Sequence, residues 1–504
     1  MTEINRSVKT VVKNTGIMLY SEFLCKVFTF IYFIIVARYL GVGDFGTISF
    51  ALAFAGILQV LTDFGLNQYT VREVSKDKEL AHKFLWGTSL VRSLLVVLAL
   101  VIFLLFMMVY QYPESTQNVL QFIVISAFLG SFINGYYALY QAFENMTLIS
   151  LGKLLNSVLM LMLTGLLLFG GFGLIWVAAV YVIVNIIVLI YCIIAAKPMR
   201  NNINKAFDLK SCYNLLKASI PFGITNFFII MYFQVDSVML GIMQGSDSVG
   251  VYNAAYRLMA GLLIIPSVVG VVIYPMLSRS YGQLRNSFML IFEKAIKYLL
   301  LIAFPTVIGT QILAEEIIMT IYGESFTQSI TVLRLLIWAI IPIYCGYVFG
   351  SLLYASNKQN IFAIITAIAA FANIALNYLL IPLISFNGAA ISTFLTESLV
   401  QVSLFLIIRK EFKHFNLNKM IMPPLLACIP MGAILLVMKS IIQQDLGIFG
   451  LVAFISIGMT IYGLGVHYFN GLDEYDKNIL HSLQNLANEK YLHRFRGFIK
   501  SLLI

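Results

Sequence analysis

Charged residues interrupt the long apolar stretches of this chain. Glu22 and Lys26 lie one helical turn apart in the first stretch, while Asp236 and Arg257 flank the polar turn GSDSVG further along. A charge in the centre of a membrane-spanning helix costs about 2.5–3.5 kcal/mol on insertion scales, so such a side chain normally faces a partner or a cavity. The bases could bind phosphate through charge-assisted hydrogen bonds, and the acids could bind a proton or Na⁺.

Each acid could instead neutralise a neighbouring base. Glu22 precedes Lys26, the better order for an ion pair within a helix. Lys26 either forms an ion pair with Glu22 alone or faces a central cavity. Asp236 and Arg257 are expected at similar depth and could pair across the turn, or Arg257 could stay available for a ligand. Arg92, near one end of its own apolar stretch, is a third candidate base for the same cavity.

The second half of the chain carries one more deep acid. Glu397 lies with Thr393 and Gln401 on one polar helical face, and the preceding stretch presents Asn373 and Asn377 in the same way. Such faces either join helices by hydrogen bonds or line a cavity. Glu397 is therefore a further acid that could bind a coupling ion or form a charge pair.

The apolar stretches are the elements that must position these residues. Hydrophobic residues make up 60% of the chain and charged residues 11%, far from the composition of soluble domains. A membrane-spanning helix needs about 20 apolar residues. The sequence predicts an all-α polytopic membrane protein with about fourteen such helices, near residues 15–38, 45–66, 84–109, 118–142, 147–169, 172–196, 218–242, 249–276, 289–313, 330–354, 360–381, 386–408, 421–440 and 446–469.

The basic residues predict which side of the membrane each loop faces. Most of the 33 Lys and Arg residues fall in alternate loops and in the C-terminal tail. By the positive-inside rule, both termini are expected in the cytoplasm. Topology thus accounts for the net charge of +10, and because the bases form no continuous stripe, nucleic acid is not an expected partner.

The longest polar break divides the chain after six helices. Because six is even, the two halves have the same orientation and are expected to be parallel repeats about an axis along the membrane normal. We expect an N-terminal six-helix bundle, a cytoplasmic linker, a second six-helix bundle, two additional helices and a basic amphipathic tail, at residues 1–196, 197–217, 218–408, 409–470 and 471–504.

Several kinds of chemistry have no matching pattern in the sequence. The chain lacks a Gly-x-x-x-x-Gly-Lys-Ser/Thr loop for nucleotide hydrolysis. Its five cysteines are far apart, which favours free thiols over disulfides or a metal site. The predicted external loops are short, whereas a glycosyltransferase or polymerase usually needs a larger one. We expect a secondary transporter with no catalytic residue, metal or cofactor, and keep a membrane glycosyltransferase or polymerase as the second alternative.

Two segments resemble a known family. VARYLGVGDFGTISFALAFAGILQVLTDFGLNQYTVRE at 36–73 and QVDSVMLGIMQGSDSVGVYNAAYRL at 234–258 are similar to the polysaccharide transporter family. Its members are flippases for lipid-linked oligosaccharides such as O-antigen precursors. They belong to the superfamily that also contains multidrug exporters and lipid II flippases, and the layout of six, six and two helices fits nearly the whole chain.

The resemblance implies two six-helix bundles around a cavity that opens alternately to each side of the cytoplasmic membrane. When lipid II flippases are aligned on these motifs, two cavity arginines fall on Lys26 and Arg257, but another falls on Tyr32. That departure argues against lipid II as the substrate. Their last two helices form a groove for the lipid tail, and 421–440 and 446–469 are the expected counterparts.

The resulting hypothesis is an exporter of a polyprenyl-(pyro)phosphate-linked oligosaccharide for surface polysaccharide or glycoconjugate biosynthesis. Lys26, Arg257 and Arg92 would bind the phosphate or the glycan. Expected partners are this substrate, the lipid bilayer, and a glycan polymerase or glycosyltransferases of the same pathway. The first alternative is a cation-coupled multidrug antiporter of the same superfamily, which is less favoured because organic cations would prefer acids to these bases.

Overall fold

The computed structural model describes residues 2–199, 209–280, 285–411, 417–442, 447–474 and 476. Every regular element within these ranges is helical. The α-helices are α1 (Thr2–Asp63), α2 (Leu66–Lys76), α3 (Ala81–Val109), α4 (Glu114–Ala142), α5 (Met146–Phe169), α6 (Leu174–Ala195), α7 (Leu209–Met243), α8 (Ser246–Leu262), α9 (Ile264–Ser280), α10 (Arg285–Ile321), α11 (Ser329–Leu336), α12 (Ile340–Ala355), α13 (Gln359–Glu411), α14 (Leu417–Ile441) and α15 (Gly447–Tyr468). The predicted amphipathic tail lies outside the described residues, apart from 471–474 and 476.

The helices confirm the predicted all-α membrane fold. In the described part of the chain, 12 helical segments are long and apolar enough to cross a membrane. Two of them, of 48 and 52 residues, contain non-helical residues at Gly41 and at Ile384–Ser385. If each of these two crosses the membrane twice, the total is compatible with the predicted fourteen. One predicted helix, near 249–276, is divided at Leu263 into α8 and α9.

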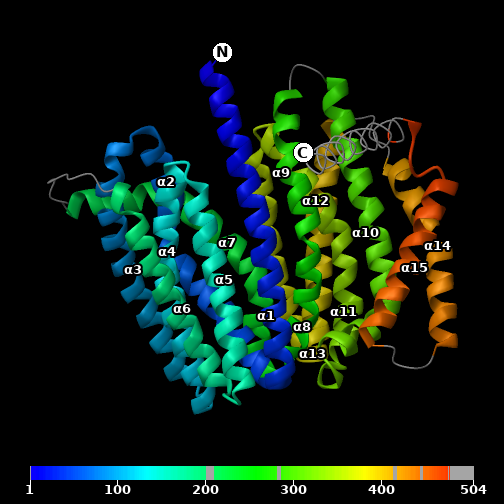
Figure 1. The fold of residues 1–504 in the computed structure, drawn as a ribbon, viewed down its shortest axis with the longest axis horizontal. Coiled ribbons are helices and arrows are strands. Elements are labelled where there is room, and N and C mark those ends of the chain that lie inside the picture. The colour runs from blue at the N-terminus through cyan, green and yellow to red at the C-terminus, as the bar shows by residue number, and fades with distance from the viewer. Residues whose placement is uncertain are drawn as a thin grey trace, which may run out of the picture.

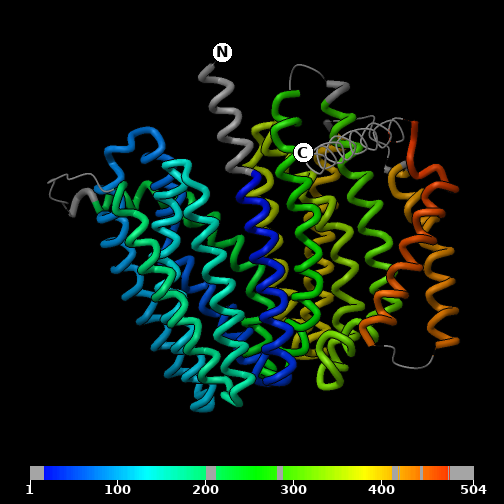
Figure 2. Tube along the Cα trace, in the orientation of Figure 1, coloured from blue at the N-terminus to red at the C-terminus, as the bar shows by residue number. Residues whose placement is uncertain are grey.

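Gly41 allows the first long helix to turn back on itself. Its φ of 77° lies in the left-handed region, which glycine adopts without a steric penalty. Figure 2 shows the blue N-terminal helix reversing at the end of the molecule opposite the label N. The charge distribution predicts this end to be external. We therefore call the end with Gly41 the outer end and the opposite one the inner end.

Helix α1 lies between two groups of helices. Helices α2 to α6 lie on one side of it, and α8 to α13 lie on the other (Figure 1). Helix α7 packs against α13 and is counted with the second group. Its most extensive contacts are with α5 in the first group and α8 in the second. Helices α14 and α15 pack against each other and against α10, at the edge of the second group.

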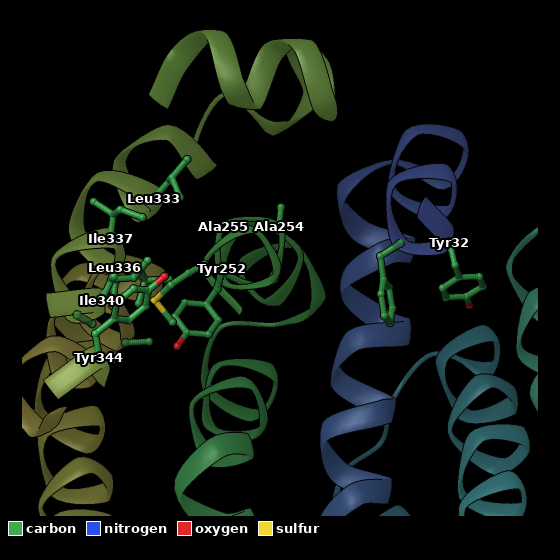
Figure 3. Close-up of a cluster of buried hydrophobic side chains, with 14 of the residues drawn as sticks. Tyr32, Tyr252, Ala254, Ala255, Leu333, Leu336, Ile337, Ile340 and Tyr344 are labelled. Atoms are coloured by element: carbon green, nitrogen blue, oxygen red, sulfur yellow. The ribbon is translucent and has the colours of Figure 1, made fainter. Parts of the chain in front are cut away.

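Buried aromatic and aliphatic residues hold the second group together. Leu336, Ile340 and Tyr344 from α11 and α12 lie against Tyr252 of α8 (Figure 3). The Tyr344 hydroxyl also donates to the Leu262 carbonyl oxygen at 2.9 Å. By contrast, α3 exposes a row of large apolar side chains, as expected for a lipid-facing helix: Leu94, Val97, Leu98, Val101, Leu104 and Leu105.

Helix α1 closely contacts the second group at the outer end. A methyl group on Gly46 would overlap the Ser246 carbonyl oxygen, and one on Gly250 would overlap the carbonyl oxygen of Val42. Arg38 adds a polar contact, because its guanidinium donates to the last carbonyl oxygens of α10, including that of Ile321 at 2.7 Å. The outer ends of α1, α8 and α10 are therefore sealed together.

A second close contact joins the groups at the inner end. Gly65, with φ of 83°, precedes α2. A methyl group on Gly65 would overlap the backbone of Ser219 and Gly223 in α7, and one on Gly223 would overlap the Phe64 carbonyl. We call these two close contacts the outer seam and the inner seam. Both depend on glycine because backbones can approach this closely only where Cβ is absent.

We predict that Gly250→Ala opens the outer seam, because the added methyl has no room against α1. In a protein whose five native cysteines are replaced, a single cysteine is introduced at Phe30. The measurement is its labelling by a membrane-impermeant maleimide added from outside. Labelling should rise several-fold. Gly261→Ala on the same helix is the matched control, since a methyl there meets nothing within 4 Å. Equal labelling in both variants would contradict the prediction.

Candidate functional site

A cavity of about 670 Å³ lies between α1 and the second group of helices. Phe23, Lys26, Val27 and Phe30 line it from α1. The remaining wall comes from α8 to α11 and from α14 and α15, and is almost entirely apolar. Among the described residues that line it, Lys26 alone carries a charge. The cavity therefore offers one cation at the edge of a large apolar surface.

Lys26 is free to bind a ligand in this cavity. It forms no hydrogen bond or ion pair with any described residue. Glu22, the acid expected to neutralise it, instead binds Lys153 of α5, with Nζ and Oε1 2.5 Å apart. The Glu22–Lys26 pair is thus not formed, and the interpretation in which Lys26 faces a cavity fits the structure.

Arg257 is held by aromatic rings. Its guanidinium carbon lies 3.2 Å from the ring centroid of Phe33, which belongs to α1. The Arg257 Nε is buried without a hydrogen-bond partner. Arg257 does not line the large cavity, although its neighbour Leu258 does. Arg257 forms no ion pair with Asp236 within the described part of the chain. The ion pair considered across the GSDSVG turn is therefore absent.

Asp236 is satisfied by neutral groups. The side chain is 4% exposed. Its carboxylate accepts hydrogen bonds from Asn377 at 2.6 Å, Thr393 at 2.7 Å and Tyr252 at 2.8 Å. A buried carboxylate without a basic partner is costly unless hydrogen bonds or a bound cation compensate for its charge. These donors come from α13 and α8, so Asp236 joins three helices of the second group.

Glu397 lies beside Asp236 in the interior of the second group. Both side chains line a small cavity of about 20 Å³, together with Asn373 and Tyr232. None of the described residues that line it is basic. The two polar faces expected around Asn373 and Glu397 therefore converge, and together with Asp236 they form a buried polar centre with two acids.

Arg92 is placed away from the large cavity. It is 1% exposed, and its guanidinium donates to Asp63 at 3.1 Å and to Asn67 at 2.8 Å. The Phe132 ring also lies near it, and a methyl group on Gly135 would overlap the guanidinium. This packing fixes the end of α1 against α3 and α4. The expectation that Arg92 faces the cavity is not met, because Asp63 and Asn67 already bind it.

Ion pairs join α10 to the segment that follows α15 at the inner end and to α14 at the outer end. At the inner end, Lys294 and Lys297 each bind Asp476 at 2.5 Å, and Tyr298 donates to the same carboxylate. Burial disfavours the charged form of Asp476, but these hydrogen bonds outweigh it and hold the pKa of the carboxyl below its ordinary value. At the outer end, Lys439 binds Glu315 and Glu316 at 3.0 and 2.9 Å.

Residues 11–281 match a protein family described as polysaccharide biosynthesis protein. This match covers more than half of the chain. The chain belongs to that family. Residues 221–379 also match the MatE family. The family expected from the 36–73 and 234–258 motifs is thereby confirmed.

Named relatives come from archaea and bacteria. The chain is 27% identical to a Haloferax volcanii protein named as a low-salt glycan biosynthesis flippase, over 38% of this chain and 40% of the relative. It is 23% identical to a Shigella flexneri protein named as an O-antigen transporter, over 71% and 88%. The match to the Staphylococcus aureus capsular polysaccharide biosynthesis protein CapF is 22% over 42% and 55%. The chain thus matches about two fifths of the first relative and most of the second.

Solved structures share the fold. The lipid II flippase MurJ in an inward closed conformation aligns with a TM-score of 0.73 at 16% identity, over 90% of this chain and 98% of that one. An inward-facing multidrug resistance transporter of the MATE family aligns with a TM-score of 0.60 at 16% identity, over 77% and 94%. These similarities show that the chain has the fold of these two transporters, in keeping with its many helices long enough to cross a membrane.

We predict that alanine substitution of two basic residues affects stability differently. Arg92→Ala leaves the acid of a buried pair without its partner, a change that typically costs about 3–5 kcal/mol, so the purified protein should melt at a clearly lower temperature. Lys26→Ala removes no ion pair and should melt like the wild type. A thermal melt in detergent measures both. A stable Arg92→Ala protein would show that the Asp63 pair is not structural.

Proposed function

We propose that this protein moves a polyprenyl-(pyro)phosphate-linked oligosaccharide across the cytoplasmic membrane by alternating access. The observation that carries this proposal is the free Lys26 in an otherwise apolar cavity. A lipid phosphate needs one charged contact for its head and an apolar surface for its chain, and the cavity offers both. The names of the relatives and the family's description support a role in surface polysaccharide or glycoconjugate biosynthesis.

The half 1–196, which includes α1, and the half 218–408 would move against each other. Arg257 is a second proposed phosphate contact, and it would become available when the N-terminal half carries Phe33 away from it. The partners that we propose are the bilayer and a glycan polymerase or glycosyltransferases of the same pathway. The apolar cavity with its base fits an anionic lipid better than an organic cation, so the multidrug antiporter is not favoured.

We predict that Lys26→Ala abolishes export, because the lipid phosphate would enter an apolar cavity without its charge partner. The measurement is surface glycan in cells that depend on this gene, with protein amount in the membrane as the reference. Lys26→Arg keeps the positive charge and should retain most of the export. Normal glycan display by a Lys26→Ala protein would contradict the proposal, because the role of Lys26 in the cavity is its main support.

We further propose that Asp236 couples transport to a monovalent cation, with Glu397 as the neighbouring acid. Asp236 is surrounded by hydroxyl and amide groups and has no base beside it among the described residues, so a proton or Na⁺ would neutralise its buried charge. A polar cluster between α4, α5 and α6 is neutral by contrast: the Asn185 side chain accepts from Asn156 and donates to Ser126. The pair of Glu22 with Lys153 makes Glu22 a weaker candidate for ion coupling.

Asp236→Asn should remove the response of transport to an ion gradient while keeping the shape of the side chain. The measurement is flipping of a fluorescent lipid-linked oligosaccharide in vesicles, with and without a Na⁺ or pH gradient. Glu397→Gln is the matched variant and shows whether the second acid shares the role. If Asp236→Asn vesicles respond to the gradients as the wild type does, Asp236 is not the coupling residue.

A further inference from the structure

The large cavity supplies too little positive charge for the head group proposed above. In a diphosphate that joins a lipid to a glycan, each phosphorus keeps one ionised oxygen, so the head group carries about two negative charges and several acceptor oxygens. Lys26 is the one cation among the described residues that line the cavity. Arg257 is covered by Phe33 in this state. A further cation within reach of Lys26 is therefore needed.

The geometry of α1 brings Glu22 to the same exposed face as Lys26. At about 100° per residue, Glu22 falls between Thr29 and Lys26 around the helix, about 20° from the first and 40° from the second. Phe23, Lys26 and Thr29 are all exposed, and Phe23 and Lys26 line the cavity. Glu22 therefore lies on the open side of α1, close to the cavity.

The seam between α1 and α5 fixes the partner of Glu22. Ser21 and Ser150 are both buried, and their hydroxyl groups hydrogen-bond at 2.8 Å. Lys153 follows Ser150 by about one turn of α5, which places its ammonium 2.5 Å from Glu22. The side chains of Lys153 and Glu22 are 39% and 37% exposed, so the pair lies at the rim of the seam, where an incoming ligand can reach it.

We infer that Lys153 is a second phosphate-binding residue, and that Glu22 occupies it until the substrate arrives. This inference rests on the proposed function and names a diphosphate-bearing lipid as its substrate. A partly exposed ion pair is held weakly, whereas a diphosphate brings more charge and more acceptor oxygens. The incoming diphosphate takes the place of the Glu22 carboxylate on Lys153 and also binds Lys26, one helical turn from Glu22. Glu22 thus sets how strongly the substrate binds.

The test is direct binding of a polyprenyl diphosphate without its glycan to the purified full-length protein in detergent. Lys153→Ala should weaken binding about tenfold, the loss expected for one charged hydrogen bond. Glu22→Gln should tighten binding several-fold, because Lys153 loses its competitor. The double variant should bind like Lys153→Ala alone, because Glu22 acts only through Lys153. Lys83→Ala, which removes an exposed lysine from α3, is the control and should bind like the wild type.

A merely structural pair would behave differently. Glu22→Gln and Lys153→Ala would then weaken binding alike and lower the melting temperature alike, which would overturn the inference; Lys153→Arg, which keeps the charge, serves if Lys153→Ala fails to fold. If the wild type binds, Lys26→Ala does not, and Glu22→Gln leaves affinity unchanged, this inference fails while the proposed function stands. If the wild type does not bind the lipid diphosphate more tightly than the uncharged polyprenol, the proposed function fails first.

Discussion

The cost of placing charge inside an apolar helix shapes the interior of this protein. Arg92 is compensated locally by Asp63 and Asn67, within the helices of its own group. Asp236 is compensated by hydroxyl and amide donors from neighbouring helices. Lys26 has no such compensation within the described residues and faces the large cavity. Because uncompensated charge in a membrane is costly, this contrast distinguishes Lys26, which we propose as a ligand contact, from charges that are already compensated within the protein.

The fold could be predicted from the sequence because its determinants are local. Helix length follows from the run of apolar residues, whereas the orientation inferred from the bases in the loops stays a prediction. The reversal at Gly41 and the short turn before Leu174 each coincide with glycines that the printed sequence shows. The division at Leu263 was not predicted, since the apolar run continues through it without a break in composition.

The site could be predicted only in part, because its partners are distant in the chain. The depth of Lys26, Asp236 and Glu397 follows from counting along each helix. The choice of Lys153 as the partner of Glu22, 131 positions away, depends on how α5 packs on α1. Arg92 shows the same limit of prediction. Its distance from the end of its own helix could be counted in the sequence, but its contact with Asp63 at the end of α1 could not be predicted. A single sequence contains no signal for helix rotation of this kind.

The ion pairs near the two ends of α10 affect how the wall of the large cavity would move during transport. Because α14 and α15 are tied to α10 by Asp476 at one end and Lys439 at the other, a rocking motion of α10 would carry both helices with it. The apolar wall of the cavity would then keep its shape while its opening changes sides. A lipid chain held there would move together with the helices of one half and keep the same contacts. Only the head group would then pass from one environment to another.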